Sequence, residues 1–308
     1  MTRAEVAQAF DRIRPHVRRT PVLAGERADG GPLVLKLESL QHTGTFKARG
    51  AFNRLLSARA SGELTDAGVV IASGGNAGLA VAYAAGRLGI RAEVYVPEVI
   101  SPAKTGRLDA LGAHVVVGGA SYGDALTAAR LRIAETGAVE VHAYDQREVC
   151  AGQGTLALEL LDQTDVDTVL VAVGGGGLIA GITAGLDGRA TVVAVEPENL
   201  PTLHEAFAAG EPVDIPVDTT AVAADSLGAR RAGTVAYATT TAAGVQSVLV
   251  DDPAIIAARR HLWETYRVVV EHSGAAALAA LQAGAYIPAA TERVAVVCCG
   301  ANTDPSDL

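Results

Sequence analysis

Charged residues are scarce in this chain of 308 residues, at 19% of the total, and acidic residues outnumber basic ones to give a formal net charge of −9. Such a chain offers no broad basic surface for a phosphate backbone, so we exclude a nucleic-acid partner. No apolar run reaches the length of about 18 residues that spans a bilayer. The N-terminal segment MTRAEVAQAFDRIRPHVRR carries charges throughout and lacks the apolar stretch of a signal peptide. We therefore expect a cytoplasmic protein with no membrane partner.

Cysteine is also rare, and the three present are Cys150, Cys298 and Cys299. Three cysteines, two of them adjacent, do not form an ordinary disulfide framework. They also lack the spacing of a zinc site, and we expect no bound metal. The simplest interpretation of each is a small buried apolar side chain.

Lysine is the scarcest cation, with three residues among 25 lysines and arginines. Strand alternation places Lys36 on one face with Val34 and Glu38, and we expect Lys104 to face solvent at the start of a helix. Lys47 differs, because it follows TGTF at the entry to a segment with helical character. A helix N-terminus disfavours a cation, and a lowered pKa is what an amine nucleophile requires.

What is abundant is a regular alternation of short valine-rich runs and helix-length segments. It predicts an α/β fold with parallel sheets that helices cover on both faces. No linker or internal repeat divides the chain, so any division into domains must come from packing. The predicted strands cover 33–38, 68–73, 92–97, 114–119, 139–144, 168–174, 191–196, 246–251 and 293–300, and the predicted helices include 47–58, 78–90, 123–136 and 252–269.

Three glycine-rich junctions follow predicted strands. At residues 73–77 (SGGNA) a helix starts after a strand, and its unpaired N–H groups favour an anion, although a tight turn capped by Asn76 explains the pattern equally well. At Gly174–Gly177 four glycines carry a large conformational cost, which a phosphate approaching the backbone would justify. At the third junction, Cys299 either fills the core or meets the ring of a ligand at the carboxyl end of a strand.

The second junction also fits a different class of enzyme. Gly175, Gly177 and Ala180 match G-x-G-x-x-A, and Glu196 ends the next predicted strand. This is the dinucleotide-binding fingerprint, so a nicotinamide-dependent oxidoreductase is a competing hypothesis. Four consecutive glycines satisfy that spacing almost automatically, which weakens the match.

Five sequence blocks occur together in a known order: KLESLQHTGTFKARGAFN, SGGNAG, GQGTLALELL, VGGGGLIAGI and CCGANTD. From about residue 20 onward the chain resembles the pyridoxal-phosphate-dependent threonine and serine dehydratases of the fold-type II, tryptophan-synthase-β-like superfamily. The resemblance implies a homodimer of two-domain subunits, each with twisted, mostly parallel sheets flanked by helices and the cofactor in the cleft between domains. The implied large, cofactor-binding domain comprises 1–52 and 147–308, and the small domain comprises 53–146.

The resemblance also assigns roles to individual residues. It implies that Lys47 binds pyridoxal phosphate covalently, that Phe46 packs beside the cofactor, and that Asn76 bonds to the phenolic oxygen of its ring. Cys299 would face the pyridine nitrogen. The phosphate would be held by Gly174, Gly175, Gly176, Gly177 and the Leu178 amide, and the substrate carboxylate by the backbone of Ser73, Gly74, Gly75, Asn76 and Ala77.

The implied activity is the dehydration and deamination of a β-hydroxy L-amino acid, of the threonine or serine type, to a 2-oxo acid and ammonia. A preference for a bulkier β-hydroxy amino acid, a related β-eliminase or racemase, and a non-catalytic amino-acid-binding protein stay open. Serine racemases of this superfamily carry a serine where this chain has Gly74, which disfavours racemisation. Because the sequence ends just after CGANTD, we expect no C-terminal regulatory domain and no feedback by isoleucine.

Two further residues have open roles. His272 stands where many relatives have proline, as either a polar core residue or a substrate-selecting group. Glu196 aligns with a divalent-cation ligand of some relatives, but the companion carboxylate position is Thr202 here.

Overall fold

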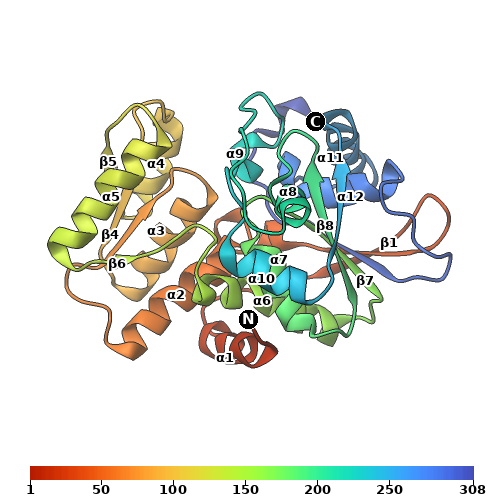
Figure 1. The fold of residues 1–308 in the computed structure, drawn as a ribbon, viewed down its shortest axis with the longest axis horizontal. Helices are drawn as coiled ribbons and strands as arrows, with labels where there is room; N and C mark the ends of the chain where they lie inside the picture. Colours follow the sequence, from red (N-terminus) through yellow and green to blue (C-terminus); the bar gives the residue numbers. More distant parts are fainter.

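The protein contains two β-sheets with helices packed on their faces, as the computed structural model of residues 1–308 shows (Figure 1). The larger sheet has six strands, in the order β1 (Val22–Glu26), β2 (Pro32–Lys36), β10 (Val294–Val297), β7 (Thr168–Ala172), β8 (Thr191–Pro197) and β9 (Gln246–Val250). The smaller sheet has four, in the order β5 (His114–Val117), β4 (Ala92–Val96), β3 (Val69–Ala72) and β6 (Val139–Glu140).

Every strand pair is parallel except β1 with β2, which confirms the predicted α/β class. The antiparallel edge strand β1 was not predicted, because its sequence, VLAGE, is short and contains a glycine. The strand predicted at 139–144 is shorter than expected. Only Val139 and Glu140 pair with β3, after which the chain leaves the sheet edge.

Twelve α-helices connect and cover these strands. They are α1 (Arg3–Ile13), α2 (Lys47–Ser61), α3 (Asn76–Leu88), α4 (Pro102–Ala110), α5 (Tyr122–Thr136), α6 (Arg147–Gln163), α7 (Gly177–Leu186), α8 (Thr202–Ala209), α9 (Ala224–Leu227), α10 (Thr234–Ala242), α11 (Asp252–Tyr266) and α12 (His272–Gln282). Three short 3₁₀ helices complete the chain: η1 (Glu38–Leu40), η2 (His42–Gly44) and η3 (Pro305–Asp307). None of the helices is long and apolar enough to cross a bilayer.

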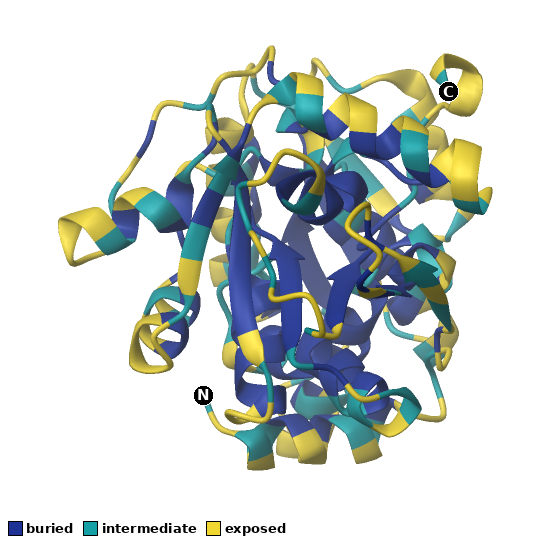
Figure 2. Ribbon diagram, turned by 90° about the vertical axis from the view of Figure 1, so that its right-hand side faces the viewer, coloured by how far each residue is buried: buried dark blue, intermediate teal, exposed yellow.

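The main hydrophobic core surrounds the six-stranded sheet. It contains 45 buried residues, against 22 in the main cluster around the smaller sheet, so most of the apolar burial that stabilises the fold lies in the larger half. The central strands are buried along their whole length, whereas outward helix faces are exposed (Figure 2).

Helices α6 and α7 cross with glycine against glycine. A Cβ on Gly181 would lie 2.2 Å from the Cys150 carbonyl oxygen, and one on Gly154 would lie 2.4 Å from the Gly181 carbonyl oxygen. The two backbones are therefore in direct contact, and no side chain separates them. This contact fixes the start of α7, which carries the glycine loop, relative to α6.

The proposed domain boundaries remain a prediction. The strands of the smaller sheet all fall within 53–146 and those of the larger sheet outside it, which supports the division. Helix α2 continues across the proposed boundary at residue 52 and contacts both α3 and α6. Lys47, its first residue, therefore lies where the two halves meet.

Candidate active site

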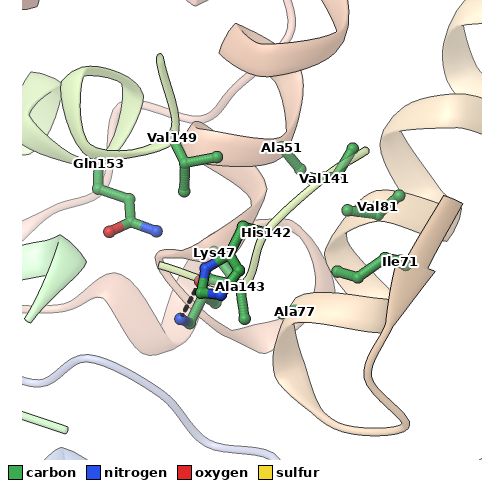
Figure 3. A pocket seen from close by; sticks show the side chains of 10 residues that line it. All are labelled: Lys47, Ala51, Ile71, Ala77, Val81, Val141, His142, Ala143, Val149 and Gln153. Atoms are coloured by element: carbon green, nitrogen blue, oxygen red, sulfur yellow. Dashed lines mark hydrogen bonds between the residues drawn. The ribbon is translucent and has the colours of Figure 1, made fainter. Parts of the chain in front are cut away.

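Lys47 occupies the first position of α2, and its side chain points into a cavity between the two halves (Figure 3). Its Nζ donates a hydrogen bond to the Ala143 carbonyl oxygen at 2.8 Å and lies 5.1 Å from the centre of the Phe46 ring. No carboxylate forms an ion pair with it. Burial lowers the pKa of Lys47 to about 8, and this effect outweighs the opposing influence of Cys150, Cys299 and Glu271. At pH 7 roughly a tenth of this amine is therefore neutral, far more than for a lysine at its ordinary value.

The glycine loop lies beside this amine. Gly176 has a φ of +86°, the left-handed conformation that glycine adopts readily, and α7 begins immediately after it. No side chain caps the first turn of α7, so its N–H groups are available to an anion. The glycines are also required by the chain itself. A Cβ would lie 2.4 Å from the Tyr144 ring if placed on Gly175 and 2.5 Å from the Ala236 side chain if placed on Gly176.

A second helix start faces the same region. Helix α3 begins at Asn76, with Gly75 as its N-cap residue in extended conformation, and it too lacks a side-chain cap. The Ser73 hydroxyl accepts a hydrogen bond from the Gly75 N–H at 3.4 Å, which shapes the turn. Helix α9 connects the two junctions, because Gly174 packs against Leu227 and the Asp225 carbonyl lies near Gly75. The two anion-receptive helix starts therefore belong to one site.

The side chains of Asn76 and Cys299 are linked through the start of α12. Asn76 Nδ2 donates to the Glu271 carboxylate at 2.9 and 3.2 Å, and the Ser273 hydroxyl donates to Glu271 Oε1 at 2.9 Å. The Cys299 thiol donates to the Ser273 carbonyl oxygen at 3.4 Å. Burial raises the pKa of both Glu271 and Cys299, so the thiol stays neutral.

Gln153 tests whether the cavity suits a polar cofactor. Its side chain is fully buried, lines the cavity with Lys47, and has no partner in the chain for either Oε1 or Nε2. Buried amides are almost always hydrogen-bonded, so the cavity offers both a donor and an acceptor to a polar guest. The residues present therefore fit pyridoxal phosphate: a nucleophilic amine, an uncapped helix start for the phosphate and a neutral thiol for the ring.

These features define the class of the protein: an α/β protein in which a lysine amine with a lowered pKa lies near two uncapped helix starts. The sequence model described as pyridoxal-phosphate dependent enzyme matches residues 13–300. The chain belongs to this family. The resemblance that the five sequence blocks indicate, the α/β fold with structural neighbours among fold-type II enzymes, and the pyridoxal phosphate cofactor are thereby confirmed.

The relatives include dehydratases. The biosynthetic L-threonine dehydratase of Mycobacterium tuberculosis is 38% identical over 98% of this chain and 72% of its own length. The phenylserine dehydratase of Ralstonia pickettii is 37% identical over 95% of this chain and 90% of its own. Among solved structures, maize serine racemase gives a TM-score of 0.91 at 30% identity, covering 99% of this chain and 94% of its own. Threonine deaminase from T.th. gives 0.87 at 35%, covering 99% and 100%.

Glu196 is the acidic residue of the dinucleotide-binding fingerprint, but its hydrogen bonds stabilise the fold. Its buried carboxylate accepts hydrogen bonds from the N–H groups of Leu203 and His204 at 2.7 and 2.8 Å and from the Ser247 hydroxyl at 3.1 Å. It therefore caps α8, and burial raises its pKa to about 7. The family assignment leaves the oxidoreductase alternative without support.

His272 is the first residue of α12 and is half-buried. Burial lowers its pKa, and the charges that influence it most are those of Arg259, Asp307 and Asp252. This environment favours the polar core residue over the substrate-selecting group.

Several residues of the site were not predicted from the sequence. His142 and Ala143 line the cavity, the Tyr144 ring packs on the glycine loop, and Glu271 holds Asn76. His142 Nδ1 accepts hydrogen bonds from the Tyr144 and Asp145 N–H groups, which fixes the orientation of its ring. His142, Ala143 and Tyr144 belong to the run 139–144, whose pattern predicts a strand and gives no sign of a role in the site.

Proposed function

We propose that this protein is a pyridoxal-phosphate-dependent lyase that converts a β-hydroxy L-amino acid, of the threonine or serine type, to a 2-oxo acid and ammonia. The observation that carries the proposal is the Lys47 amine, with a pKa of about 8, placed among two uncapped helix starts. One helix start suits the cofactor phosphate and the other a substrate carboxylate. The chain covers 72% of the first threonine dehydratases that it matches, and these relatives support the reaction class.

Each residue then has a defined task. The Lys47 amine would hold the cofactor, and when free it would take the proton from the substrate α-carbon. The N–H groups at the start of α7 (Gly177 and Leu178) hold the phosphate, and those of residues 73–77 hold the substrate carboxylate. Pyridoxal phosphate, when bound, withdraws electrons from the α-carbon so that its C–H bond breaks more easily.

The neutral partner at Cys299 favours elimination. A buried thiol that stays protonated would not pair with a cationic ring nitrogen, so negative charge at the α-carbon would not be strongly stabilised. Loss of the β-hydroxyl would remove this charge, and the proton taken from the α-carbon balances its departure as water. Addition of one water molecule to the product then yields the 2-oxo acid and ammonia, so the net reaction needs no further reactant.

The chain is similar to maize serine racemase, but it has Gly74 where serine racemases carry a serine, and this difference gives no support to racemisation. A Cβ on Gly74 would lie 2.4 Å from the Ile100 Cδ1 atom. A serine at this position would require the end of the flexible Ile100 side chain to move. No second function is proposed on this ground.

The test is a coupled assay for 2-oxo acid and ammonia on L-threonine, L-serine and phenylserine, with wild-type protein and Lys47→Ala. We expect product from at least one of these substrates and none with the variant. A wild-type protein that does not take up pyridoxal phosphate would overturn the cofactor assignment. One that takes it up but releases no 2-oxo acid would be the amino-acid-binding alternative.

A cytoplasmic homodimer is a further part of the proposal. It is supported by the acidic composition and by the resemblance to the dehydratase family. Light scattering after size-exclusion chromatography measures the mass of the assembly against the 31.3 kDa of one chain.

A further inference from the structure

Asn302 is the centre of a hydrogen-bonded chain that reaches the site from outside. It follows β10 in the block CCGANTD. Its Nδ2 donates to the Thr43 carbonyl oxygen and to Asn76 Oδ1, each at 2.8 Å, and its Oδ1 accepts from the Arg107 guanidinium at 2.6 Å. Guanidinium can only donate and a carbonyl can only accept, so these partners leave the Asn302 amide one possible orientation.

The orientation of Asn302 sets that of Asn76. Because Asn302 donates to Asn76 Oδ1, the Asn76 nitrogen must face the Glu271 carboxylate. Glu271 in turn accepts from Ser273, whose carbonyl oxygen accepts from the Cys299 thiol. Asn76 and Cys299, the two side chains assigned to opposite parts of the cofactor ring, are therefore held by one continuous chain of bonds.

Arg107 brings a distant element into this chain. It lies on α4, which packs with the smaller sheet, whereas Asn302 follows a strand of the larger sheet. A second contact crosses the same gap: Lys104, also on α4, pairs with Asp225 of α9 at 3.0 Å. The Lys104 pair does not touch the hydrogen-bonded chain. Helix α4 thus makes two charged contacts with the larger half. The contact of Arg107 belongs to the hydrogen-bonded chain, and that of Lys104 does not.

We propose that Arg107 and Asn302 are positioning residues for the reaction, because they fix the orientation of the Asn76 amide. The position of α4 and the alignment of the cofactor ring then depend on each other. This inference rests on the proposed function. Neither residue touches the reacting atoms; each acts through Asn76. A small misplacement of a group in contact with the cofactor is enough to lower the rate greatly.

The experiment compares Arg107→Ala and Asn302→Ala with the matched control Lys104→Ala, which removes the unconnected contact of the same helix. For the first two we expect a fall in kcat on the order of tenfold to a hundredfold. We also expect, without any substrate, a change in the absorption spectrum of the bound cofactor and weaker uptake of pyridoxal phosphate by the apoprotein. Lys104→Ala should keep kcat, spectrum and uptake close to wild type. Arg107→Lys, which keeps a cationic donor, should restore part of the loss.

Three results would overturn the proposal: wild-type spectrum and kcat in Arg107→Ala, an equal loss in Lys104→Ala, or a double variant Arg107→Ala/Asn302→Ala that loses as much as the two single losses combined. The effects of two substitutions within one hydrogen-bonded chain should not be additive. If the wild-type protein binds cofactor but makes no 2-oxo acid, the proposed function fails. The spectrum and the cofactor uptake then still decide whether Arg107 positions Asn76.

Discussion

Two lysines, the fully buried Lys36 and the half-buried Lys47, have opposite surroundings. Lys36 is fully buried, and its Nζ donates to the Glu159 carboxylate at 2.9 Å, to Gln163 at 2.8 Å and to a backbone carbonyl at 2.8 Å. Lys47 has one carbonyl partner, Ala143, and no ion pair. Burial lowers the pKa of both. Carboxylates oppose that change in each case, but only Lys36 forms an ion pair with one, Glu159. Carboxylate pairing, and not burial alone, separates a structural lysine from a reactive one.

Lys36 belongs to a balanced group of four charges. Arg49 donates to both oxygens of Glu38 and to both oxygens of Glu159, and Glu159 also pairs with Lys36. Two cations thus face two anions, and no member lacks a partner. Arg49 lies on α2 two residues after Lys47, so this group also anchors the helix that begins with the reactive amine.

The largest expected effect comes from removing the reactive amine. Lys47→Ala should lower kcat by at least about 10³-fold, because it removes both the covalent attachment and the proton acceptor. Lys47→Arg should be equally inactive, since guanidinium stays protonated and cannot form the bond. The coupled 2-oxo acid assay measures both, and circular dichroism checks that they are folded. Substantial activity in either variant would exclude Lys47 as the catalytic amine.

The next effect is on stability. Lys36→Met should lower the free energy of unfolding by about 3–5 kcal/mol, because it leaves the buried carboxylates of Glu38 and Glu159 with Arg49 as their one cation, and so leaves one negative charge uncompensated in the core. Urea denaturation of the apoprotein measures the change. The double variant Lys36→Met/Glu159→Gln should recover part of the loss, since the Arg49–Glu38 pair then stands balanced. A single variant as stable as wild type would show that Lys36 is not needed for charge balance.

The third effect is a dependence on pH. With a pKa of about 8, the neutral fraction of Lys47 rises about tenfold per pH unit below that value and then levels off. Attachment of pyridoxal phosphate to the apoprotein should follow this curve in stopped-flow absorbance. The unfolded chain keeps this proton to higher pH than the folded one, so the contribution of Lys47 to stability should rise between pH 8 and pH 10.5, the ordinary lysine value. Attachment that still accelerates about tenfold per pH unit between pH 9 and pH 10.5, as an ordinary lysine would, would refute the lowered pKa.

The smallest effect separates Lys36 from the third lysine. The Lys104 side chain is 45% exposed and pairs with Asp225, which is 87% exposed. Lys104→Arg should therefore change the free energy of unfolding by less than about 0.5 kcal/mol. Lys36→Arg should cost about 1–3 kcal/mol, because the larger head group does not fit the three acceptors that surround Nζ. Equal stabilities in thermal denaturation would contradict this difference.

Local patterns predicted the α/β class, most strands, the helix starts and the special status of Lys47. They did not predict contacts between distant segments. Alternation placed Lys36 on a strand face, but Glu159 lies more than a hundred residues away, and only packing of α6 against β2 brings the two together. Glu271 was missed for the same reason, because its importance comes from Asn76 in another part of the chain. The sequence predicted the glycine loop as a phosphate site. The structure adds a second reason for the glycines, because a side chain on Gly175 or Gly176 would overlap Tyr144 or Ala236.

The glycine crossing of α6 and α7 limits which substitutions the chain can accept. A side chain on Gly154 or Gly181 would overlap the backbone of the facing helix and push the two helices apart. Because α7 starts at the glycine loop, such a shift would also move the N–H groups that we assign to the phosphate. These two glycines, far from the reacting atoms, are therefore as closed to substitution as the site itself.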